Sequence, residues 1–322
     1  MNWITRWKKI GIKVKQIFKK QPVGQEASDW KTCPLCKKIT YKPDLFKNSY
    51  ICECSFHHDM PPKLRLDSLF DSGYEIIEAP DNINPDPLNF EVQDGAREGY
   101  KYSDKIKKYR KATGQQTALL CASGNISNLS AVVVCFAPRF GAGRMGPAEA
   151  EHFLKSANIA VKKKVDIWVV VYQSSGIDVH TGVIGLTSGM TKTVIAMNEI
   201  KKAGIPTFAV AARAVAGGTY ASNFFMHDFI IVESKCVENL LFSGKRVTAN
   251  ILKGTDQIPE DFGRADGIMK SGLADITLES RKKLKETITK LANIILKKKE
   301  IETTEEAHEN QEDFKKTAST AS

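Results

Sequence analysis

Four of the seven cysteines lie close together near the start of the chain, in a pattern that favours metal binding. Two residues separate Cys33 from Cys36, and after 15 further residues one residue separates Cys52 from Cys54. Two short-spaced thiol pairs on adjacent hairpins can close a tetrahedral Zn²⁺ site. A segment this short cannot build its own hydrophobic core, so a bound metal would supply much of its folding free energy. We therefore predict one structural zinc ion held by these four cysteines.

The second thiol pair departs from the usual spacing of a zinc knuckle. A regular knuckle has two residues between its cysteines, so its second cysteine would fall at Ser55, directly after Cys54. His57 and His58 are the alternative fourth ligands, because imidazole also binds zinc. The competing interpretation is a degenerate knuckle that holds no metal.

Three glycine-rich turns, each directly after an expected strand, form the second feature with chemical potential. They read FGAGRMG at 140–146, SSG at 174–176 and AGGT at 216–219. Glycine lets the backbone approach a ligand closely and leaves N–H groups free where a helix begins. Such N–H groups stabilise phosphates or a developing oxyanion.

The remaining motifs and the histidines limit the kinds of reaction that the core could catalyse. The sequence has neither a Gly-Lys-Ser/Thr phosphate loop nor a Rossmann fingerprint, so nucleotide hydrolysis and hydride transfer lack support. His152 falls on an expected helix, while His180 and His227 have no obvious acidic or nucleophilic neighbour in the sequence. The pattern favours acyl chemistry at backbone oxyanion holes, without a nucleophilic side chain.

Alternating strands and helices must position these turns. Strands that alternate with helices require crossover connections, which predicts an α/β fold. The expected elements follow from hydrophobic periodicity and from stop signals. In chain order they are a strand at 129–136, a helix at 147–163, a strand at 165–172, a helix at 190–202 and strands at 207–212 and 229–233.

Composition and charge exclude several classes of protein. The chain has 322 residues, of which 42% are hydrophobic and 26% charged, as is usual for a globular protein. Its apolar stretches, such as the one around 165–172, are far shorter than the ~20 residues that span a bilayer. The net charge of +10 is concentrated at one end, since residues 1–66 hold 14 Lys and Arg against five Asp and Glu. The charge therefore describes the N-terminal region and not the core.

Composition also divides the chain into five segments. The first segment is expected to form a basic helix with an apolar stripe along it. Three roles stay open for this helix: docking against a partner or the rest of the protein, contact with an anionic membrane surface, and service as a transit peptide. The segments are a basic amphipathic segment at 1–29, a zinc ribbon at 30–58, a linker at 59–115, a core domain at 116–299 and a polar, disordered tail at 300–322.

The motifs resemble, in order and spacing, those of the carboxyltransferase β-subunit family of bacterial and plastid-type acetyl-CoA carboxylases. The resemblance runs from residue 1 to about residue 291. The ribbon of that family has two Cys-x₂-Cys pairs, 15 residues apart, and then a His-His pair, which is His57-His58 here. Its Phe-x-Gly-Gly-Ser-Met-Gly turn is similar to 140–146, and its Gly-Gly-Val-x-Ala-Ser segment is similar to 217–222.

The resemblance implies a crotonase-like core of ββα units and a defined reaction. Carboxyl transfer from carboxybiotin on a carrier protein to acetyl-CoA would give malonyl-CoA for fatty acid synthesis. It also implies an α₂β₂ assembly with an α subunit, further partnership with the biotin carboxyl carrier protein and biotin carboxylase, and a cytoplasmic location, with a plastid-like organelle as the alternative. In this family backbone N–H groups stabilise the enolate and the biotin oxyanion. The residues that the resemblance assigns are Gly217, Gly218, Ser175 and Gly176 to catalysis, and Gly143, Met145 and Gly146 to cofactor binding.

Two turns depart from the family pattern. Ser174–Gly182 reads Ser-Ser-Gly-Ile-Asp-Val-His-Thr-Gly, where the family has Ser-Gly-Gly-Ala-Arg-Met-x-Glu-Gly, so Asp178 stands in place of an arginine. Arg144 stands where serine is usual. The alternatives are therefore a non-catalytic or substrate-shifted acyl-CoA carboxyltransferase scaffold, and nucleic-acid binding by the basic ribbon.

Overall fold

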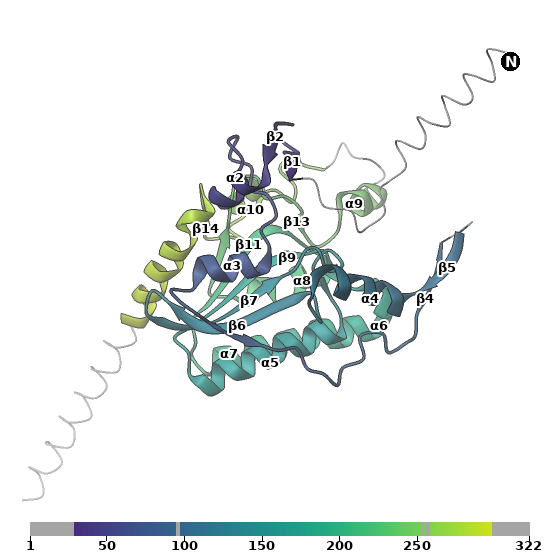
Figure 1. Ribbon diagram of the computed structural model, residues 1–322, viewed down its shortest axis with the longest axis horizontal. Coiled ribbons are helices and arrows are strands. Elements are labelled where there is room, and N and C mark those ends of the chain that lie inside the picture. Colours follow the sequence, from purple (N-terminus) through teal and green to yellow (C-terminus); the bar gives the residue numbers. More distant parts are fainter. Residues whose placement is uncertain (1–28, 95–96, 253, 255–257, 298–322) are drawn as a thin grey trace, which may run out of the picture. The chain divides into compact units, whose positions relative to one another are not determined.

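The computed structural model describes residues 29–94, 97–252, 254 and 258–297 (Figure 1). These residues belong to two compact units that divide between Asn48 and Ser49. The amphipathic helix predicted within 1–29 and the disordered tail predicted at 300–322 lie outside the described residues, apart from residue 29.

The first unit is a small hairpin followed by a short helix. Strands β1 (Trp30–Thr32) and β2 (Ile39–Tyr41) pair antiparallel, with Trp30 opposite Tyr41. The rings of these two residues lie 5.1 Å apart between centroids. Helix α2 (Lys42–Lys47) starts directly after β2, and it has a proline in its first turn, where a missing N–H costs no helical hydrogen bond.

An eight-stranded mixed sheet forms the centre of the second unit. Its strand order is β14-β12-β11-β9-β7-β6-β3, and β13 also pairs with β11. The neighbours from β14 to β7 run parallel, whereas β6 pairs antiparallel with both β7 and β3. The strands are β3 (Glu75–Ile77), β6 (Leu119–Ile126), β7 (Leu129–Phe136), β9 (Ile167–Ser174), β11 (Thr207–Ala216), β12 (Phe229–Val232), β13 (Leu240–Leu241) and β14 (Ile276–Thr277).

Two short ladders lie outside this sheet. Strands β8 (Arg144–Met145) and β10 (Gly176–Ile177) pair parallel, and this ladder joins two of the glycine turns. Strands β4 (Glu91–Asp94) and β5 (Arg97–Lys101) form an antiparallel hairpin.

The helices follow the strands along the chain. They are α3 (Pro62–Leu69), α4 (Tyr102–Thr113), α5 (Pro147–Lys163), α6 (Gly182–Ile184), α7 (Thr191–Lys202), α8 (Gly217–Ser222), α9 (Lys245–Ile251), α10 (Ala265–Lys270) and a last helix at 284–297. A π-helical turn, Gly185–Met190, leads into α7. Short 3₁₀ turns cover Val179–Thr181, Phe224–Met226 and Arg281–Lys283. In the part of the chain that the structure describes, no helix is long and apolar enough to cross a membrane.

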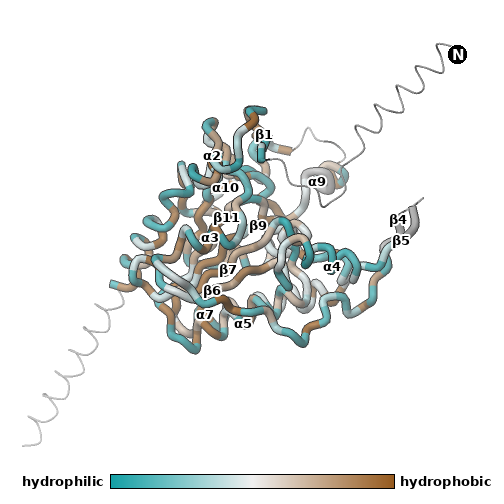
Figure 2. The backbone as a smooth tube through the Cα atoms, viewed as in Figure 1, coloured by the Kyte–Doolittle hydropathy of each residue, from teal (hydrophilic) through white to brown (hydrophobic). Residues whose placement is uncertain are grey.

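The sheet is buried on both faces, so its strands are almost continuously hydrophobic (Figure 2). Side chains alternate between the faces: Val132 and Val134 pack in the core beneath α5 and α7, while Val133 packs with α3 and the helix at 284–297. Figure 1 shows α5 and α7 together along one face of the sheet. The sheet therefore holds the strand ends, and with them the turns, in a rigid frame.

The predicted α/β class is confirmed. The strand at 129–136 and the helix at 147–163 have the predicted bounds. The predicted strand at 207–212 continues to Ala216, because a register shift between Ala211 and Val215 lets its end pair with β13. The end of this strand therefore coincides with the start of the third glycine turn.

Candidate active site and metal centre

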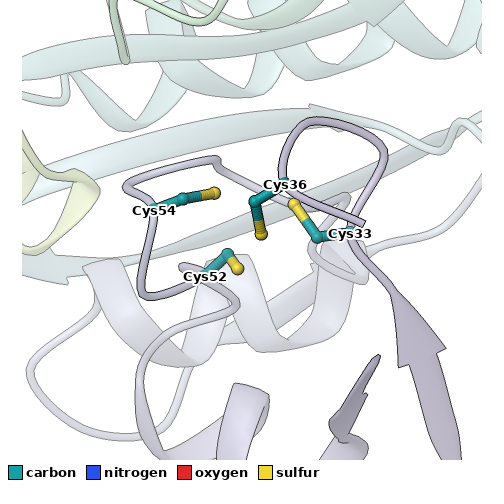
Figure 3. Close-up of side chains that lie close together, drawn as sticks. All are labelled: Cys33, Cys36, Cys52 and Cys54. Atoms are coloured by element: carbon teal, nitrogen blue, oxygen red, sulfur yellow. The ribbon is translucent and has the colours of Figure 1, made fainter. Parts of the chain in front are cut away.

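The four cysteine side chains of the ribbon gather around one point (Figure 3). Their sulfur atoms all lie within 4.8 Å of one another, and Cys33 and Cys52 are buried. Each pair sits in a tight turn: the N–H of Cys33 donates to Lys38 O at 2.8 Å, and the N–H of Cys52 donates to Phe56 O at 2.8 Å. Local backbone hydrogen bonds therefore fix the orientation of both pairs.

The chemistry of this donor set fits zinc. A tetrahedral site with Zn–S bonds of about 2.3 Å has sulfur–sulfur edges of about 3.8 Å, which the observed limit of 4.8 Å accommodates. Cys54 belongs to the group, whereas His57 does not, and its Nδ1 lies 3.6 Å from Oε1 of Glu233. The left-handed conformation of Ser55, with φ of +66°, lets the chain turn after only one intervening residue.

The three glycine turns meet at the carboxyl ends of β7, β9 and β11. A Cβ atom on Gly143 would lie 1.8 Å from Gln173 O, and one on Gly176 would lie 2.7 Å from Ala216 O. The first turn therefore packs directly on the second, and the second on the third. Only glycine permits these approaches, and both residues have positive φ angles. The structure thus brings together three turns that the sequence separates by 27 and 39 residues.

The third turn presents the start of a helix. Helix α8 begins at Gly217, and its N-cap residue Ala216 has no side chain that could accept a hydrogen bond. The first N–H groups of a helix have no partner within the helix, so those of Gly217 and Gly218 are suited to an anionic oxygen. A Cβ atom on Gly218 would lie 2.2 Å from Ile177 Cγ1, which ties this turn to β10.

The N–H groups of the second turn already donate within the chain. The N–H of Ser175 donates to Ala142 O at 3.0 Å, and the N–H of Gly176 donates to Ser174 Oγ at 3.1 Å. The hydroxyl oxygens of Ser174 and Thr219 lie 3.1 Å apart, which joins the second turn to α8. A ligand would have to replace the Ser174 hydroxyl to reach the Gly176 N–H.

The residues expected to bind a cofactor in the first turn are also engaged within the chain. The N–H of Gly143 donates to Phe140 O at 3.1 Å, and the N–H of Gly146 donates to Glu149 Oε2 at 3.1 Å. The side chain of Met145 is fully buried in the core beneath α5. The first turn therefore supports the second turn, and its own polar groups are engaged within the chain.

A buried cluster of charged and polar residues lies beside the turns, and it was not predicted from the sequence. Arg144 donates from Nη1 to Asp178 Oδ2 and to the Tyr102 hydroxyl, and the Tyr102 hydroxyl donates to Asp178 Oδ2. His180 places Nδ1 2.9 Å from Asp178 Oδ1, so this histidine does have an acidic neighbour. The Asp-x-His spacing was the available signal. Burial by itself would raise the pKa of Asp178, but the charge of Arg144 and the hydrogen bonds from Tyr102 and His180 lower it.

A second buried polar group lies beneath α8. The hydroxyl of Tyr172 donates to Asn223 Oδ1 at 2.7 Å and lies 2.9 Å from His227 Nε2. Asn223 in turn donates to Thr193 Oγ1 at 2.9 Å. Burial lowers the pKa of His227 to about 3, so this imidazole is neutral and structural. The network anchors the end of α8 to the sheet and to α7.

A hollow of about 570 Å³ opens beside α8. Its wall includes Tyr220 from α8, Leu240 and Leu241 from β13, and Ile268 and Lys270 from α10. The hollow is mainly apolar, and Lys270 supplies a cation in its wall, although it also pairs with Asp261 at 3.1 Å.

Comparisons with known proteins agree with this arrangement. Residues 98–321 match the model of the carboxyl transferase domain family. The acetyl-coenzyme A carboxylase carboxyl transferase subunit beta of Pelagibacter ubique is 33% identical over 302 residues, which cover 92% of this chain and 93% of that protein. The protein of the same name from Sulfurihydrogenibium sp. is 33% identical over 278 residues, which cover 86% and 94%.

Solved structures share the fold at low sequence identity. The transcarboxylase 12S structure with methylmalonyl-coenzyme A bound matches with a TM-score of 0.57 and 18% identity, over 77% of this chain. The chain spans 42% of that longer protein. The Pseudomonas malonate decarboxylase MdcD–MdcE heterodimer matches with a TM-score of 0.52 and 15% identity, over 74% of this chain and 86% of that one. These matches confirm the predicted crotonase-like core.

Proposed function

The chain belongs to the carboxyl transferase family, in its group of acetyl-CoA carboxylase β subunits, and on this premise we propose how its residues serve the reaction. The function is transfer of a carboxyl group from carboxybiotin to acetyl-CoA, which gives malonyl-CoA. The observation that supports the assignment to particular residues is the meeting of three glycine turns at the start of α8, whose first N–H groups have no partner within the helix.

The third turn would stabilise the charge that develops on the substrate. Loss of a proton from the acetyl methyl group places negative charge on the thioester oxygen. The N–H groups of Gly217 and Gly218 would donate to that oxygen at about 2.7–3.1 Å, the range in which fixed donors stabilise an oxyanion most strongly. Because the frame around them is packed, little reorganisation would accompany the reaction. No nucleophilic side chain is needed.

The second turn would serve the other reactant. Carboxybiotin supplies the activated carboxyl group when it is bound, and Ser175 and Gly176 are the residues proposed to face its ureido oxygen. The N–H of Gly176 becomes available once the Ser174 hydroxyl turns toward Thr219, which already lies 3.1 Å away. The role proposed for the first turn is then to fix the position of the second turn, through Gly143, Met145 and Gly146.

An α subunit and a carrier protein are the proposed partners. Next to the second turn, Val179 and Val183 are 81% and 70% exposed, and Leu186 is also exposed. An apolar surface beside an open site fits a subunit interface. The proposed assembly is an α₂β₂ heterotetramer in the cytoplasm, working with biotin carboxyl carrier protein and biotin carboxylase. The four ribbon cysteines would hold one structural zinc ion.

The test is turnover in the reconstituted complex. The chain is co-expressed with an α subunit, and malonyl-CoA-dependent carboxylation of free biotin is measured. We expect turnover in the complex and none for either subunit alone. Replacement of Gly218 by Val should abolish turnover without preventing assembly, because the new side chain would displace Ile177 and the start of α8. An intact complex without turnover would instead support a non-catalytic scaffold, and turnover with a longer acyl-CoA would support a shifted substrate.

The surface of the first unit favours nucleic-acid binding as a second candidate function. Trp30 and Phe46 are more than half exposed, and lysines surround them in the sequence. Aromatic faces stack on bases, and lysines neutralise phosphates. In the full chain, we expect replacement of both Trp30 and Phe46 by Ala to weaken salt-sensitive binding of a single-stranded oligonucleotide. Equal binding by wild type and variant would reject this second function.

A further inference from the structure

The buried cluster around Arg144 links two glycine turns that the sheet alone does not hold. Arg144 is 5% exposed, and its guanidinium contacts Asp178 and the Tyr102 hydroxyl, with Nη2 3.6 Å from Glu149 Oε1. Arg144 lies in the first turn, and Asp178 lies two residues after the second. This ion pair adds a buried, charge-assisted link to the two-residue ladder of β8 and β10.

Asp178 is the centre of the cluster. Its Oδ2 accepts from Arg144 and Tyr102, and its Oδ1 accepts from the backbone N–H of His180 at 3.1 Å. Its own N–H donates to Met145 O at 2.9 Å. The ring of His180 stacks on Tyr102 with 4.4 Å between centroids and 5° between planes. Every hydrogen bond of this carboxylate therefore fixes the exit of the second turn.

The two charges stand in unusual places. The resemblance described above places serine at the position of Arg144 and arginine at the position of Asp178, so both charged residues depart from that pattern. Arg144 lies opposite Gly176 in the parallel ladder, so its side chain starts from the strand that pairs with the second turn.

The conformation of the second turn depends on this link. Gly176 has a φ of +103° and lies against Ala216 and Gly217, so a shift of the second turn is transmitted to the start of α8. Removal of one partner of a buried pair leaves an uncompensated charge, which the surrounding backbone must move to solvate. A displacement of about 1 Å at a reacting centre can cost about 100-fold in rate.

We propose that Arg144 and Asp178 are positioning residues for carboxyl transfer, and that their ion pair holds the second glycine turn in register with the first and third. The inference rests on the proposed function. Neither residue touches the substrate; each acts through the backbone of the turn that it fixes.

The test uses the complex with its α subunit and two readouts. We expect R144M and D178N each to lower the kcat of malonyl-CoA-dependent biotin carboxylation by about 30- to 100-fold, with the KM for malonyl-CoA changed less than about threefold. The conservative variant R144K should retain most of the activity, and D178N carries the test by itself if R144M fails to fold. The exchange variant R144D/D178R should recover at least about tenfold over D178N, because it restores both charges with their positions reversed.

The second readout is hydrogen exchange of the backbone amides of residues 174–182. It should accelerate in D178N, stay slow in R144K and slow again in the exchange variant. The control is R65M, which breaks the buried pair of Arg65 and Glu233 away from the turns and should leave both kcat and exchange at 174–182 unchanged. If the wild-type complex shows no turnover, the proposed function fails while the exchange data still decide this inference. Unchanged exchange at 174–182 in D178N would overturn it.

Discussion

Arg65 of α3 forms a two-pronged ion pair with Glu233, which directly follows β12, although 168 residues separate them in the sequence. Nη1 and Nη2 of the arginine donate to the two carboxylate oxygens at 3.0 and 2.9 Å, and both side chains are buried. Arg281, just before the last helix, contacts the same carboxylate. One acidic group thus joins α3, the sheet and the C-terminal helix on the face opposite α5.

Replacement of Glu233 by Gln should destabilise the fold by about 3–5 kcal/mol at neutral pH, because two buried guanidinium groups lose their counter-ion. Urea unfolding of the variant and the wild type measures the difference. Glu286→Gln is the matched control, since it breaks an exposed pair with Lys290 and should leave the free energy of unfolding nearly unchanged. If both variants lose the same free energy of unfolding, the buried ion pairs stabilise the fold no more than the exposed pair does.

The same carboxylate predicts a loss of stability in acid. Burial would raise the pKa of Glu233, but Arg65 and Arg281 lower it from 4.5 to about 2. A carboxyl group with a lowered pKa in the folded state contributes stability that is present above its unfolded pKa and is lost as the pH falls toward the folded value. We therefore expect the wild type to lose stability between about pH 4.5 and about pH 2, and Glu233→Gln to lose less over that range.

The buried imidazole of His227 predicts a separate change in stability, at higher pH. Burial lowers its pKa from 6.5 to about 3, so the unfolded chain binds a proton that the folded chain does not. Stability should fall as the pH decreases, by about 2 kcal/mol between about pH 7 and about pH 5. In His227→Gln most of that slope should disappear. His152, whose buried ring also has a lowered pKa, would leave a smaller slope in both proteins.

Metal analysis should identify the ligands in the ribbon. Purified wild-type chain should contain about one zinc ion, and Cys54→Ser should lose most of it because a hydroxyl is a poor replacement for a thiolate. Cys236→Ser and His57→Gln should keep the metal, since neither residue belongs to the cysteine group. Full zinc occupancy in Cys54→Ser would show that the site is held by the other three cysteines and a different fourth ligand.

Because the first turn packs directly on the second, the addition of one methyl group at Gly143 should strongly destabilise the fold. Gly143→Ala should destabilise the chain by at least about 3 kcal/mol, because its Cβ would collide with Gln173 O and its φ of +67° disfavours alanine. Gly73→Ala, with nothing within 4 Å of its new Cβ, should change the stability by less than about 0.5 kcal/mol. Urea midpoints of both variants distinguish this contact from a general cost of losing glycine.

The sequence alone determined the fold class and the types of site. The strand at 129–136 and the helix at 147–163 could be read because each has an unmistakable period and ends at turn residues. The four cysteines and the three glycine turns were also visible, because their chemistry depends on residue type and short spacing. The motif order was specific enough to indicate the family, which the comparisons confirm.

The tertiary structure decided which of these features touch one another. Arg144 and Asp178 each looked like a departure from the family pattern, and only the pairing of β8 with β10 turns them into one buried ion pair. Likewise, the N–H group of Ser175 was expected to be open, yet it donates to Ala142 O in the first turn. Such contacts depend on register between strands far apart in the chain. Register is set by packing of the whole sheet, and no local pattern of residues encodes it.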